Sequence, residues 1–547
     1  MLSPLTRLAA DGAAAVKVLT RTGLLAPVRP DKLVGIGLSA LRWGSSPAAA
    51  YAMGAIREPG RLAVIDERES VTYAEIDRRS TAVAHALKQR GVGAGDAVAL
   101  LARNSAAFVV AQVAISKLGA DVLYVNTGFA GPQLGDVLSS EKAVAVVADE
   151  EFAPLLDGLG SKLPRLVAWS DDEKAPDSIA ALGAEDAPSL PSPGREGRHV
   201  ILTSGTTGKP KGAARPTPGV LAGIVQMVSV LEAIPYRARG VTVLAAPAFH
   251  AWGLANLTLG MLLQSTLVMR RRFDPAVTLE LVEKYDADTL AAVPVMIQRI
   301  LDLPEKERSK RDTSSLRVVT LSGSALPPSL ATKFTDEFGD VLYSLYGSTE
   351  VAYVSIARPS DFRAAPSTAG RVVRGVTVRL VDDKDNDVAP GETGRIFAGS
   401  SAMFEGYTNG EDKTRLGALT STGDMGRFED GRLFVEGRDD DMIVSGGENV
   451  FPAEVEDCLH QHADVTDAAV VGVEDERFGQ ALVGHVVLRS GASASPDDLR
   501  VHVKKSLANY KVPREIVIHD ELPRNETGKV LKRELREAKN DEAKSSG

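Results

Sequence analysis

Short apolar runs alternate with helical segments through most of this 547-residue chain. The runs expected to form strands are 97–101, 121–124, 143–148, 200–202, 241–245, 318–321, 341–345 and 376–381. Helical patterning lies between most of them, whereas 172–198, rich in Asp, Ser, Pro and Gly, is expected to be a surface loop. This alternation predicts an α/β fold built in layers.

The start of one helix can be predicted from a capping signal. Thr72 and Glu75 form the T-x-x-E pattern of a capping box. In such a box, the side chain of each residue accepts a hydrogen bond from the backbone N–H of the other. The helix that begins there is expected to run to Gly91, a residue typical of helix C-termini.

A second unit of 110 residues is expected to begin after Gly437 with a charged run, Arg438–Asp441. Helices are predicted at 453–461 and 496–507, and strands at 467–473, 482–488 and 515–518. The predicted architecture is a large composite N-terminal body of α/β layers, with a β-rich subdomain, plus a small α+β C-terminal domain. The predicted boundaries are 1–60 for a basic N-terminal extension, 61–437 for the body and 438–547 for the C-terminal domain.

Residues 1–60 differ from the rest in charge, with a net +4 against −13 for the remainder. An apolar face at near-helical spacing is formed by Leu5, Leu8, Ala9, Val16 and Leu19. A basic amphipathic helix of this kind can lie on an anionic membrane. The favoured interpretation is a helix packed on its own domain, because Gly12 and the alanines weaken the apolar face. Association with a membrane surface stays open.

Composition excludes several classes of protein. The net charge of −9 argues against nucleic-acid binding. A single cysteine, Cys458, excludes an intrachain disulfide framework and a cysteine-ligated metal cluster, and it fits a reducing compartment. No run of about 18 apolar residues and no secretory signal are found, so we expect a cytoplasmic protein that could lie peripherally at a membrane.

The strongest local motif follows the strand expected at 200–202. It contributes glycines, hydroxyls and lysines: Thr203, Ser204, Gly205, Thr206, Thr207, Gly208, Lys209 and Lys211. Glycines let backbone N–H groups approach an anion, hydroxyls donate to phosphate oxygens and lysines add positive charge. The loop is not a Walker A motif, because two residues rather than four separate its glycines and Pro210 follows the lysine. It predicts a triphosphate site.

Further motifs follow in a fixed order along the chain. They are Tyr346–Glu350 (YGSTE), Ser421–Asp424 (STGD), Gly437–Asp440 (GRDD), Ser445–Asn449 (SGGEN) and Pro523–Lys529 (PRNETGK). Together with the loop, they resemble the adenylate-forming superfamily of acyl-CoA synthetases, luciferases and peptide-synthetase adenylation domains over residues 62–535. The chain as a whole is most similar to bacterial long-chain fatty-acid–CoA ligases.

The resemblance implies roles for residues around a nucleotide. Residues 203–212 would hold the ATP phosphates, and Gly323, Ser324 and Ala325 would contact adenine. Tyr346 would stack on the base beside Gly347, with Thr349 near the α-phosphate. Asp424 would bind the ribose and Arg438 would add charge nearby. Glu350 and Thr206 would bind Mg²⁺, and Lys529 would reach the α-phosphate and carboxylate oxygens.

The resemblance also implies a C-terminal domain that rotates between two half-reactions. Asp440 matches the hinge of the family. Gly446 and Gly447 would line the tunnel for the pantetheine arm of CoA, where glycines let a narrow chain pass close to the backbone.

The acyl pocket is expected to be apolar, lined by Phe249, His250, Trp252, Val293, Met296 and Leu345. His250 is a candidate for contact with the substrate carboxylate or for gating the pocket, and it is equally interpreted as a helix-capping histidine. Residues 213–216 depart from the family pattern after the loop. Arg270–Arg272 is interpreted as either a membrane-facing basic patch or a solvated strand end.

The function implied is ATP-dependent activation of a fatty acid to an acyl-adenylate, followed by thioester formation with CoA. AMP and pyrophosphate are released, Mg²⁺ and ATP are required, and CoA is a co-substrate. The catalytic candidates are Lys529, Glu350, Thr206 and His250. Three alternatives stay open: a ligase for an aryl or short-chain acid, a fatty acyl-AMP ligase that loads a carrier protein, and a non-catalytic nucleotide-binding scaffold. Peripheral membrane contact and oligomerisation also stay open.

Overall fold

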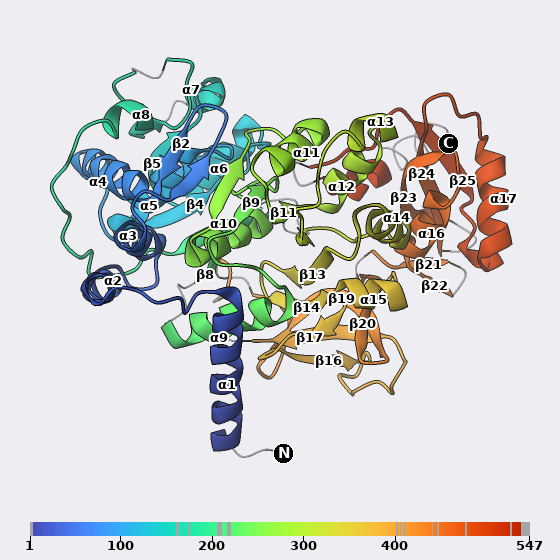
Figure 1. Cartoon of the computed structure of the whole chain (residues 1–547). Coiled ribbons are helices and arrows are strands. Elements are labelled where there is room, and N and C mark those ends of the chain that lie inside the picture. The colour runs from blue at the N-terminus through green and yellow to red at the C-terminus, as the bar shows by residue number, and fades with distance from the viewer. Residues whose placement is uncertain are drawn as a thin grey trace.

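A computed structural model describes residues 4–159, 163–172, 175–204, 210–215, 220–400, 403–404, 406–408, 410, 412–439, 441–445, 448–475, 479–525 and 528–537. The fold is α/β, with a large N-terminal body and a smaller C-terminal unit at its side (Figure 1). This confirms the predicted fold class.

Two mainly parallel sheets form the framework of the body. The first has the order β15 (Arg371–Val372), β14 (Ala352–Ala357), β13 (Leu342–Ser348), β12 (Val318–Leu321), β11 (Thr289–Ala292), β9 (Val241–Leu244), β10 (Thr266–Met269), β1 (Leu62–Ile65) and β2 (Ser70–Thr72). The second has the order β6 (Arg165–Val167), β5 (Ala143–Ala148), β3 (Ala97–Leu101), β4 (Asp121–Tyr124), β7 (His199–Ser204) and β8 (Pro210–Arg215). Their central strands are buried apolar runs, as is typical of parallel sheets covered on both faces.

One hydrophobic core joins the two sheets. Several helices contribute to it, among them α3 (Pro47–Arg57), α4 (Tyr73–Gln89), α5 (Ala106–Lys117) and α10 (Ala251–Leu263). The predicted capping box opens α4: the Thr72 N–H donates to Glu75 Oε2 at 2.8 Å, and the Glu75 N–H donates to Thr72 Oγ1 at 3.2 Å. The predicted helix and its cap are therefore confirmed.

The remaining helices of the body lie around this framework. They are α6 (Gly131–Ser140), α7 (Ala153–Gly158), α8 (Ile179–Leu182), α9 (Val220–Ala233), α11 (Pro275–Lys284), α12 (Pro294–Leu301), α13 (Glu305–Arg308), α14 (Pro328–Phe338) and α15 (Pro359–Ala364). The short helix α8 interrupts the stretch 172–198 that was expected to be a loop throughout.

The predicted β-rich subdomain is an antiparallel sheet at the bottom of Figure 1. It contains β16 (Thr377–Val381), β17 (Gly394–Gly399), β18 (Arg415–Leu416), β19 (Leu419–Glu429) and β20 (Arg432–Arg438). The C-terminal unit contains β21 (Ile443–Ser445), β22 (Glu448–Val450), α16 (Pro452–His460), β23 (Val465–Asp475), β24 (Gly479–Leu488), α17 (Pro496–Ser506) and β25 (Glu515–His519). It has a hydrophobic core of its own.

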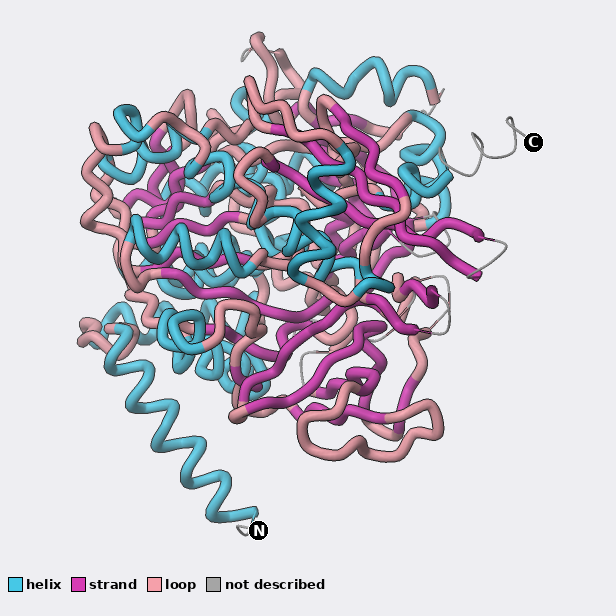
Figure 2. Tube along the Cα trace, turned by 90° about the vertical axis from the view of Figure 1, so that its right-hand side faces the viewer, coloured by secondary structure: helices cyan, strands magenta, loops and turns pink. Residues whose placement is uncertain are grey.

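Three helices precede the first strand: α1 (Pro4–Thr22), α2 (Pro30–Trp43) and the already described α3. Figures 1 and 2 show that α1 projects from the body, and its C-terminal part packs on α9. There Arg21 donates to the Leu231 carbonyl, and Val18 is buried in the same cluster. The predicted apolar face is therefore wrong at Val16, which is exposed, because the contact with α9 is made two residues further along. Within the described chain, no helix is long and apolar enough to cross a bilayer.

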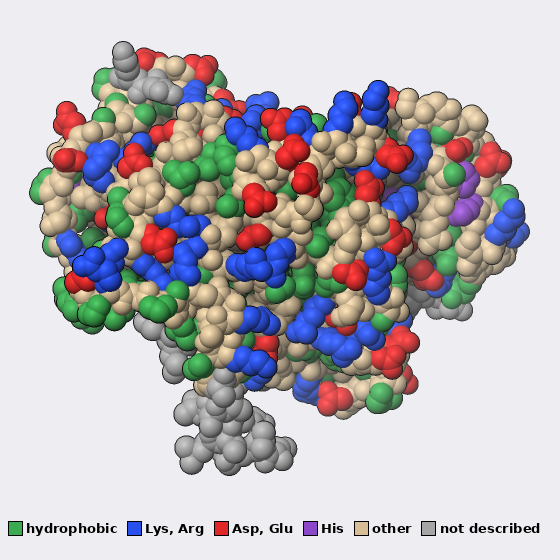
Figure 3. All heavy atoms as spheres, in the orientation of Figure 1, with side chains coloured by type: hydrophobic (Ala, Val, Ile, Leu, Met, Phe, Trp, Pro, Cys, Tyr) green, Lys and Arg blue, Asp and Glu red, His purple; other side chains and the backbone are tan. Residues whose placement is uncertain are grey.

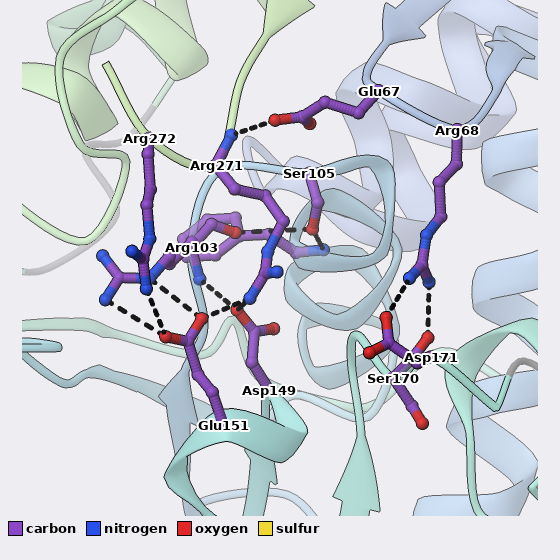
Figure 4. A network of polar contacts seen from close by, with 11 residues as sticks. Glu67, Arg68, Arg103, Ser105, Asp149, Glu151, Ser170, Asp171, Arg271 and Arg272 are labelled. Carbon is purple, nitrogen blue, oxygen red and sulfur yellow. Dashed lines mark hydrogen bonds and ion pairs between the residues drawn. The ribbon is translucent and has the colours of Figure 1, made fainter. Parts of the chain in front are cut away.

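The arginines at 270–272 do not form a free basic patch. Figure 4 shows Arg271 and Arg272 beside Asp149 and Glu151, which follow β5 of the second sheet. Arg271 lies 2.9 Å from Asp149 and also pairs with Glu151, and Arg272 lies 3.2 Å from Glu151. Arg270 pairs with Glu67 at 3.3 Å. This network connects the end of β10 to the end of β5 and pairs each of the three arginines with a carboxylate.

Candidate active site

Two strands of the β-rich sheet and one strand of the first large sheet bring together three of the predicted nucleotide residues. Asp424 on β19 and Arg438 on β20 are register partners, and Arg438 Nη1 lies 3.7 Å from Asp424 Oδ1. Tyr346, near the end of β13, donates its hydroxyl proton to Asp424 Oδ2 at 2.6 Å. A carboxylate, a phenol and a guanidinium from three strands therefore share one site.

The electrostatics of this cluster follow from its burial. Burial raises the pKa of Asp424, and the Tyr346 hydrogen bond and the positive charges of Arg438 and Lys529 oppose that rise. Burial and the neighbouring Asp424 charge raise the pKa of Tyr346 well above its usual range, so this phenol stays a hydrogen-bond donor. The charge of Lys529 acts on Asp424 although the two residues belong to different units of the chain.

The loop that carries Lys529 is seated against the body. A Cβ atom on Gly528 would lie 2.2 Å from Val295 Cγ1 in α12, and Gly528 has a φ of +77°, so only glycine suits this position. The Lys529 N–H donates to Asn525 Oδ1 at 2.9 Å, which fixes the turn. Arg524 anchors the loop to the C-terminal unit through an ion pair with Asp467. The exposed Lys529 side chain follows directly after the contact with the body.

Glu350, the predicted metal ligand, is buried and ionised. The Tyr407 hydroxyl donates to Glu350 Oε1 at 2.6 Å. Burial alone would raise the pKa of Glu350, but the hydrogen bonds from Tyr407 and Ser348 and the charge of Lys413 outweigh it and hold the pKa below its ordinary value. A buried carboxylate kept charged in this way is suited to a hard divalent cation. The part of the chain that the structure describes holds no cluster of three or more His, Cys, Asp or Glu residues able to bind a metal by themselves.

Strand β8 brings Lys211 next to Tyr407, the hydrogen-bond partner of Glu350. Lys211 Nζ lies 5.6 Å from the centre of the Tyr407 ring, so the lysine and Glu350 contact the same tyrosine. The Thr408 N–H donates to the Gly212 carbonyl at 2.8 Å. A Cβ atom on Gly212 would lie 2.6 Å from Thr408 Oγ1, which explains the glycine at the end of the motif.

Several predicted residues lie outside the described chain, namely Gly205, Thr206, Thr207, Gly208, Lys209, Asp440, Gly446 and Gly447. Thr203 and Ser204 end β7, and only their backbone is described. Because Thr203 pairs with Lys211 across the β7–β8 hairpin, the ends of the phosphate loop are fixed side by side.

The turns after β12 and β13 hold the remaining nucleotide candidates. Gly323, Ser324 and Ala325 follow β12, and Gly323 has a φ of +95° that favours glycine. At Gly347 a Cβ atom would lie 1.9 Å from the Ala352 carbonyl oxygen, so the hairpin from β13 to β14 excludes any side chain there. Thr349 lies in this turn, directly before Glu350.

Three of the predicted acyl-pocket residues, Trp252, Val293 and Met296, lie near the start of α12. Val293 lies next to Gly323, whose Cβ position is 3.6 Å from Val293 Cγ1. The Trp252 Nε1–H donates to the Ala292 carbonyl at 2.8 Å. Phe249, Val293 and Met296 are all buried in the main core. Leu345 does not join them, because it packs in the separate cluster formed with α9.

His250 is the residue immediately before α10, but its side chain does not cap the helix. Burial lowers the pKa of His250 to about 4, so the imidazole is neutral at physiological pH. Its Nε2 atom is buried and has no hydrogen-bond partner among the described residues. The helix-capping interpretation is therefore wrong, and the imidazole has an unused hydrogen-bonding atom beside the Phe249 ring, 4.4 Å away between ring centres.

Two further residues of the site, Tyr407 and Val295, have no distinguishing signal in the sequence. Tyr407 follows Gly406 in a polar loop, and neither spacing nor hydrophobic pattern distinguishes it from other loop aromatics. Val295 looks like an ordinary apolar residue of a helix. Both acquire significance only from contacts with residues far away in the sequence.

Comparison with known protein families identifies the class. A family model described as AMP-binding enzyme matches residues 53–408, and a model described as AMP-binding enzyme C-terminal domain matches residues 454–529. The chain therefore belongs to the AMP-binding enzyme family, which is the adenylate-forming superfamily that its motifs resemble.

Individual relatives show which acids are activated by proteins similar to this chain. The chain is 32% identical to an indoleacetate–CoA ligase from Aromatoleum aromaticum over 88% of this chain and 95% of that protein. It is 29% identical to a fatty acid–[acyl-carrier-protein] ligase from Streptomyces coeruleorubidus over 88% of this chain and 94% of the relative. Its structure matches o-succinylbenzoate CoA synthetase from Bacillus subtilis, solved with an acyl-adenylate intermediate, with a TM-score of 0.77, 26% identity and coverage of 89% and 97%. These relatives differ in the acid that they activate, so they do not single out long-chain fatty acids.

Proposed function

We propose that this chain activates a fatty acid with ATP to give an acyl-adenylate and then transfers the acyl group to CoA. The observation that carries this proposal is the cluster of Tyr346, Asp424 and Arg438, with the charge of Lys529 acting on it from the C-terminal unit. Family membership supports the adenylation chemistry, and the fatty acid is the specific part of the proposal.

Each member of the cluster has a proposed task. Asp424 accepts hydrogen bonds from the ribose hydroxyls, and the Tyr346 ring stacks on adenine beside the turn that contains Gly323. Arg438 offsets the negative charge that accumulates around the nucleotide. Lys529 donates to the α-phosphate and carboxylate oxygens, on which negative charge develops as the substrate carboxylate attacks phosphorus. No protein nucleophile is needed, because the substrate carboxylate and the thiol of CoA attack in turn.

The proposed metal is Mg²⁺, held by Glu350 and by the triphosphate itself. Proteins commonly bind Mg²⁺ through one or two carboxylates together with substrate phosphates. When bound there, the ion would neutralise charge on the phosphate oxygens. Tyr407 keeps Glu350 ionised and oriented, and Lys211 lies on the other side of the same tyrosine. Thr206 is the proposed second protein ligand.

The C-terminal unit is proposed to serve both half-reactions. With the loop of Lys529 seated on Val295, the chain is arranged for adenylation. Rotation about Asp440 would withdraw this loop and bring Gly446 and Gly447 to the site, where they would line the tunnel for CoA. The proposed division places the body at 61–437 and the moving unit at 438–547.

The proposed acyl site is the group formed by Phe249, Trp252, Val293 and Met296. None of these side chains carries a charge that could bind a second charged group on the acid, which favours an alkyl chain. Their two aromatic rings also suit an arylalkanoic acid, and the similarity to an indoleacetate–CoA ligase supports that second candidate. The carrier-loading alternative has its own support in the similarity to a fatty acid–[acyl-carrier-protein] ligase.

A single panel of assays tests the proposal. AMP and pyrophosphate release are followed with acids from acetate to long-chain fatty acids and with indoleacetate, each with and without CoA. We expect the highest kcat/KM with a fatty acid, and AMP release that depends on CoA. A higher kcat/KM with indoleacetate than with any fatty acid would favour an arylalkanoic acid as the substrate. Formation of acyl-adenylate without thioester would favour carrier loading, and no adenylate with any acid would support the scaffold alternative.

A further inference from the structure

Helix α2 presents an unpartnered apolar stripe to solvent. Leu33, Val34, Leu38 and Leu41 are 53%, 65%, 61% and 84% exposed. At 100° per residue these four side chains fall within a sector of about 140° on one face of the helix. Isolated exposed leucines are common on protein surfaces, but four on one face of a 14-residue helix form a continuous patch.

The opposite face of α2 is firmly packed, so the stripe is not a core face that has lost its partner. Ser39 and Trp43 are buried on that side. A Cβ atom on Gly35 would lie 3.3 Å from Ile56 of α3, which shows how closely the two helices approach. Lys32 fixes the start of the helix by donating to the Arg57 carbonyl at 2.6 Å. The outward orientation of the stripe is therefore determined by the contact with α3.

Further exposed apolar residues and cations lie in the segment of chain that precedes α2, where Arg29 also pairs with Asp31 at 3.1 Å. Leu25, in the connection before α2, is 55% exposed, and Val16 on α1 is 60% exposed. Lys17, Arg21 and Arg29 are exposed along the same stretch of chain. Figure 3 shows hydrophobic side chains gathered at the lower left of the molecule, over α2, next to a group of Lys and Arg side chains.

A shallow hollow at the start of α2 adds further positive charge. Its lining includes Lys32, Arg57 and Arg61 against one acidic residue, Glu58. The guanidinium of Arg57 donates to the carbonyls of Leu24 and Ala26, which hold it in place without neutralising its charge. The hollow lies on the α3 side of α2, at the first turn of the helix, and it can accept an anionic group there.

We propose that α2, with Leu25 directly before it, binds the surface of an anionic phospholipid bilayer. The apolar stripe would enter the boundary between headgroups and acyl chains, and the cations of this segment would contact lipid phosphates. Residues 1–60 carry a net charge of +4 on a chain whose other residues carry −13, so this is the side that an anionic surface attracts. A second copy of the chain is disfavoured as the occupant, because a symmetric contact through α2 would place these cations against each other.

Co-sedimentation of the full-length chain with vesicles tests this proposal without measuring catalysis. Phosphatidylcholine vesicles are compared with vesicles that also contain phosphatidylglycerol, at low and high NaCl. We expect binding to the anionic vesicles, weak binding to neutral ones and weaker binding at high salt. Equal sedimentation with both vesicle types would overturn the role of the cations, and absence of binding to either would overturn the proposal.

Substitutions on α2 test whether this helix makes the contact with the vesicles. The triple variant V34N/L38N/L41N removes three exposed side chains, and we expect its partition onto anionic vesicles to fall by at least about tenfold. Val501→Asn on α17, where the valine is 49% exposed, is the matched control and should bind like the unaltered chain. Since all four substituted side chains face solvent, thermal melting should be unchanged. Unreduced binding of the triple variant contradicts the proposal, and so does a dimer in solution that the triple variant disrupts without any vesicle binding.

Discussion

Lys529 belongs to the C-terminal unit, and its charge acts on Asp424 of the body. Its loop rests on Val295, and its charge opposes the rise in the pKa of Asp424. We expect Lys529→Ala to slow adenylate formation by about a hundredfold to a thousandfold, because one group that stabilises developing charge is lost. Thioester formation from supplied acyl-adenylate should be spared.

Exchange of labelled pyrophosphate into ATP measures the first half-reaction, and CoA consumption with supplied acyl-adenylate measures the second. Lys505→Ala, an exposed lysine on α17, is the control and should leave both rates unchanged. Equal loss of both half-reactions in Lys529→Ala would contradict the proposed division of labour.

Tyr407 is proposed as a positioning residue for Glu350. Tyr407→Phe removes the 2.6 Å hydrogen bond but keeps the ring that contacts Lys211. A hydrogen bond to a charged group contributes about 1.5–3 kcal/mol, so we expect the Mg²⁺ concentration needed for half-maximal activity to rise about tenfold. The pKa of Glu350 should also rise, which moves the acidic limb of the pH–rate profile to higher pH.

The exposed Tyr510 supplies the matched control, Tyr510→Phe, for which neither the Mg²⁺ dependence nor the pH profile should change. If Tyr407→Phe retains the Mg²⁺ dependence of the unaltered enzyme while Glu350→Gln abolishes activity, Tyr407 has no part in positioning the carboxylate.

At the scale of single elements, the capping box is the clearest case of sequence determining a boundary. Thr72→Ala removes the side-chain acceptor at the start of α4, and we expect a loss of about 1 kcal/mol in the free energy of unfolding. The same contacts lower the pKa of Glu75. A carboxylate with a lowered pKa in the folded protein stabilises the fold above its unfolded pKa. The difference between the two proteins should therefore shrink as pH falls through the folded pKa of Glu75.

Urea denaturation followed by circular dichroism measures this difference. Thr332→Ala on α14 is the control, because its exposed hydroxyl bonds only to a carbonyl of its own helix. An effect of Thr72→Ala no larger than that of the control would show that the capping box adds no stability.

The elements that the sequence predicts well are those whose pattern is local. Strands β3, β5 and β12 begin and end where expected, because each is a buried apolar run between polar segments. The strands β17, β18, β19 and β20 had no such signal, since their antiparallel sheet mixes buried and half-buried residues.

The same limit applies to the site. Motifs identified Tyr346 and Asp424, whereas the contacts of Glu350 with Tyr407 and of Gly528 with Val295 arise from packing between distant segments.

At the scale of the whole molecule, the ion-pair network of Figure 4 connects the two large sheets. Its central carboxylate, Asp149, is fully buried, and burial raises its pKa to about 6 although Arg271 and the Arg103 N–H favour the charged form. The folded protein therefore holds this proton more tightly than the unfolded chain. Asp149 makes its most favourable contribution to stability at low pH, and this contribution declines as pH rises from about 4 to about 6.

Asp149→Asn makes this pH dependence measurable, because the amide keeps an oxygen for the Arg103 N–H and cannot ionise. We expect the variant to gain stability relative to the unaltered protein between pH 4 and pH 7, by up to about 3 kcal/mol. Thermal melting at pH 4, 5, 6 and 7 measures the difference, with the fully exposed Asp171→Asn as control. A stability difference that does not vary with pH would mean that the charge of Arg271 compensates the burial of Asp149 completely, so that the two sheets are held together by a pair that stays ionised over the whole range.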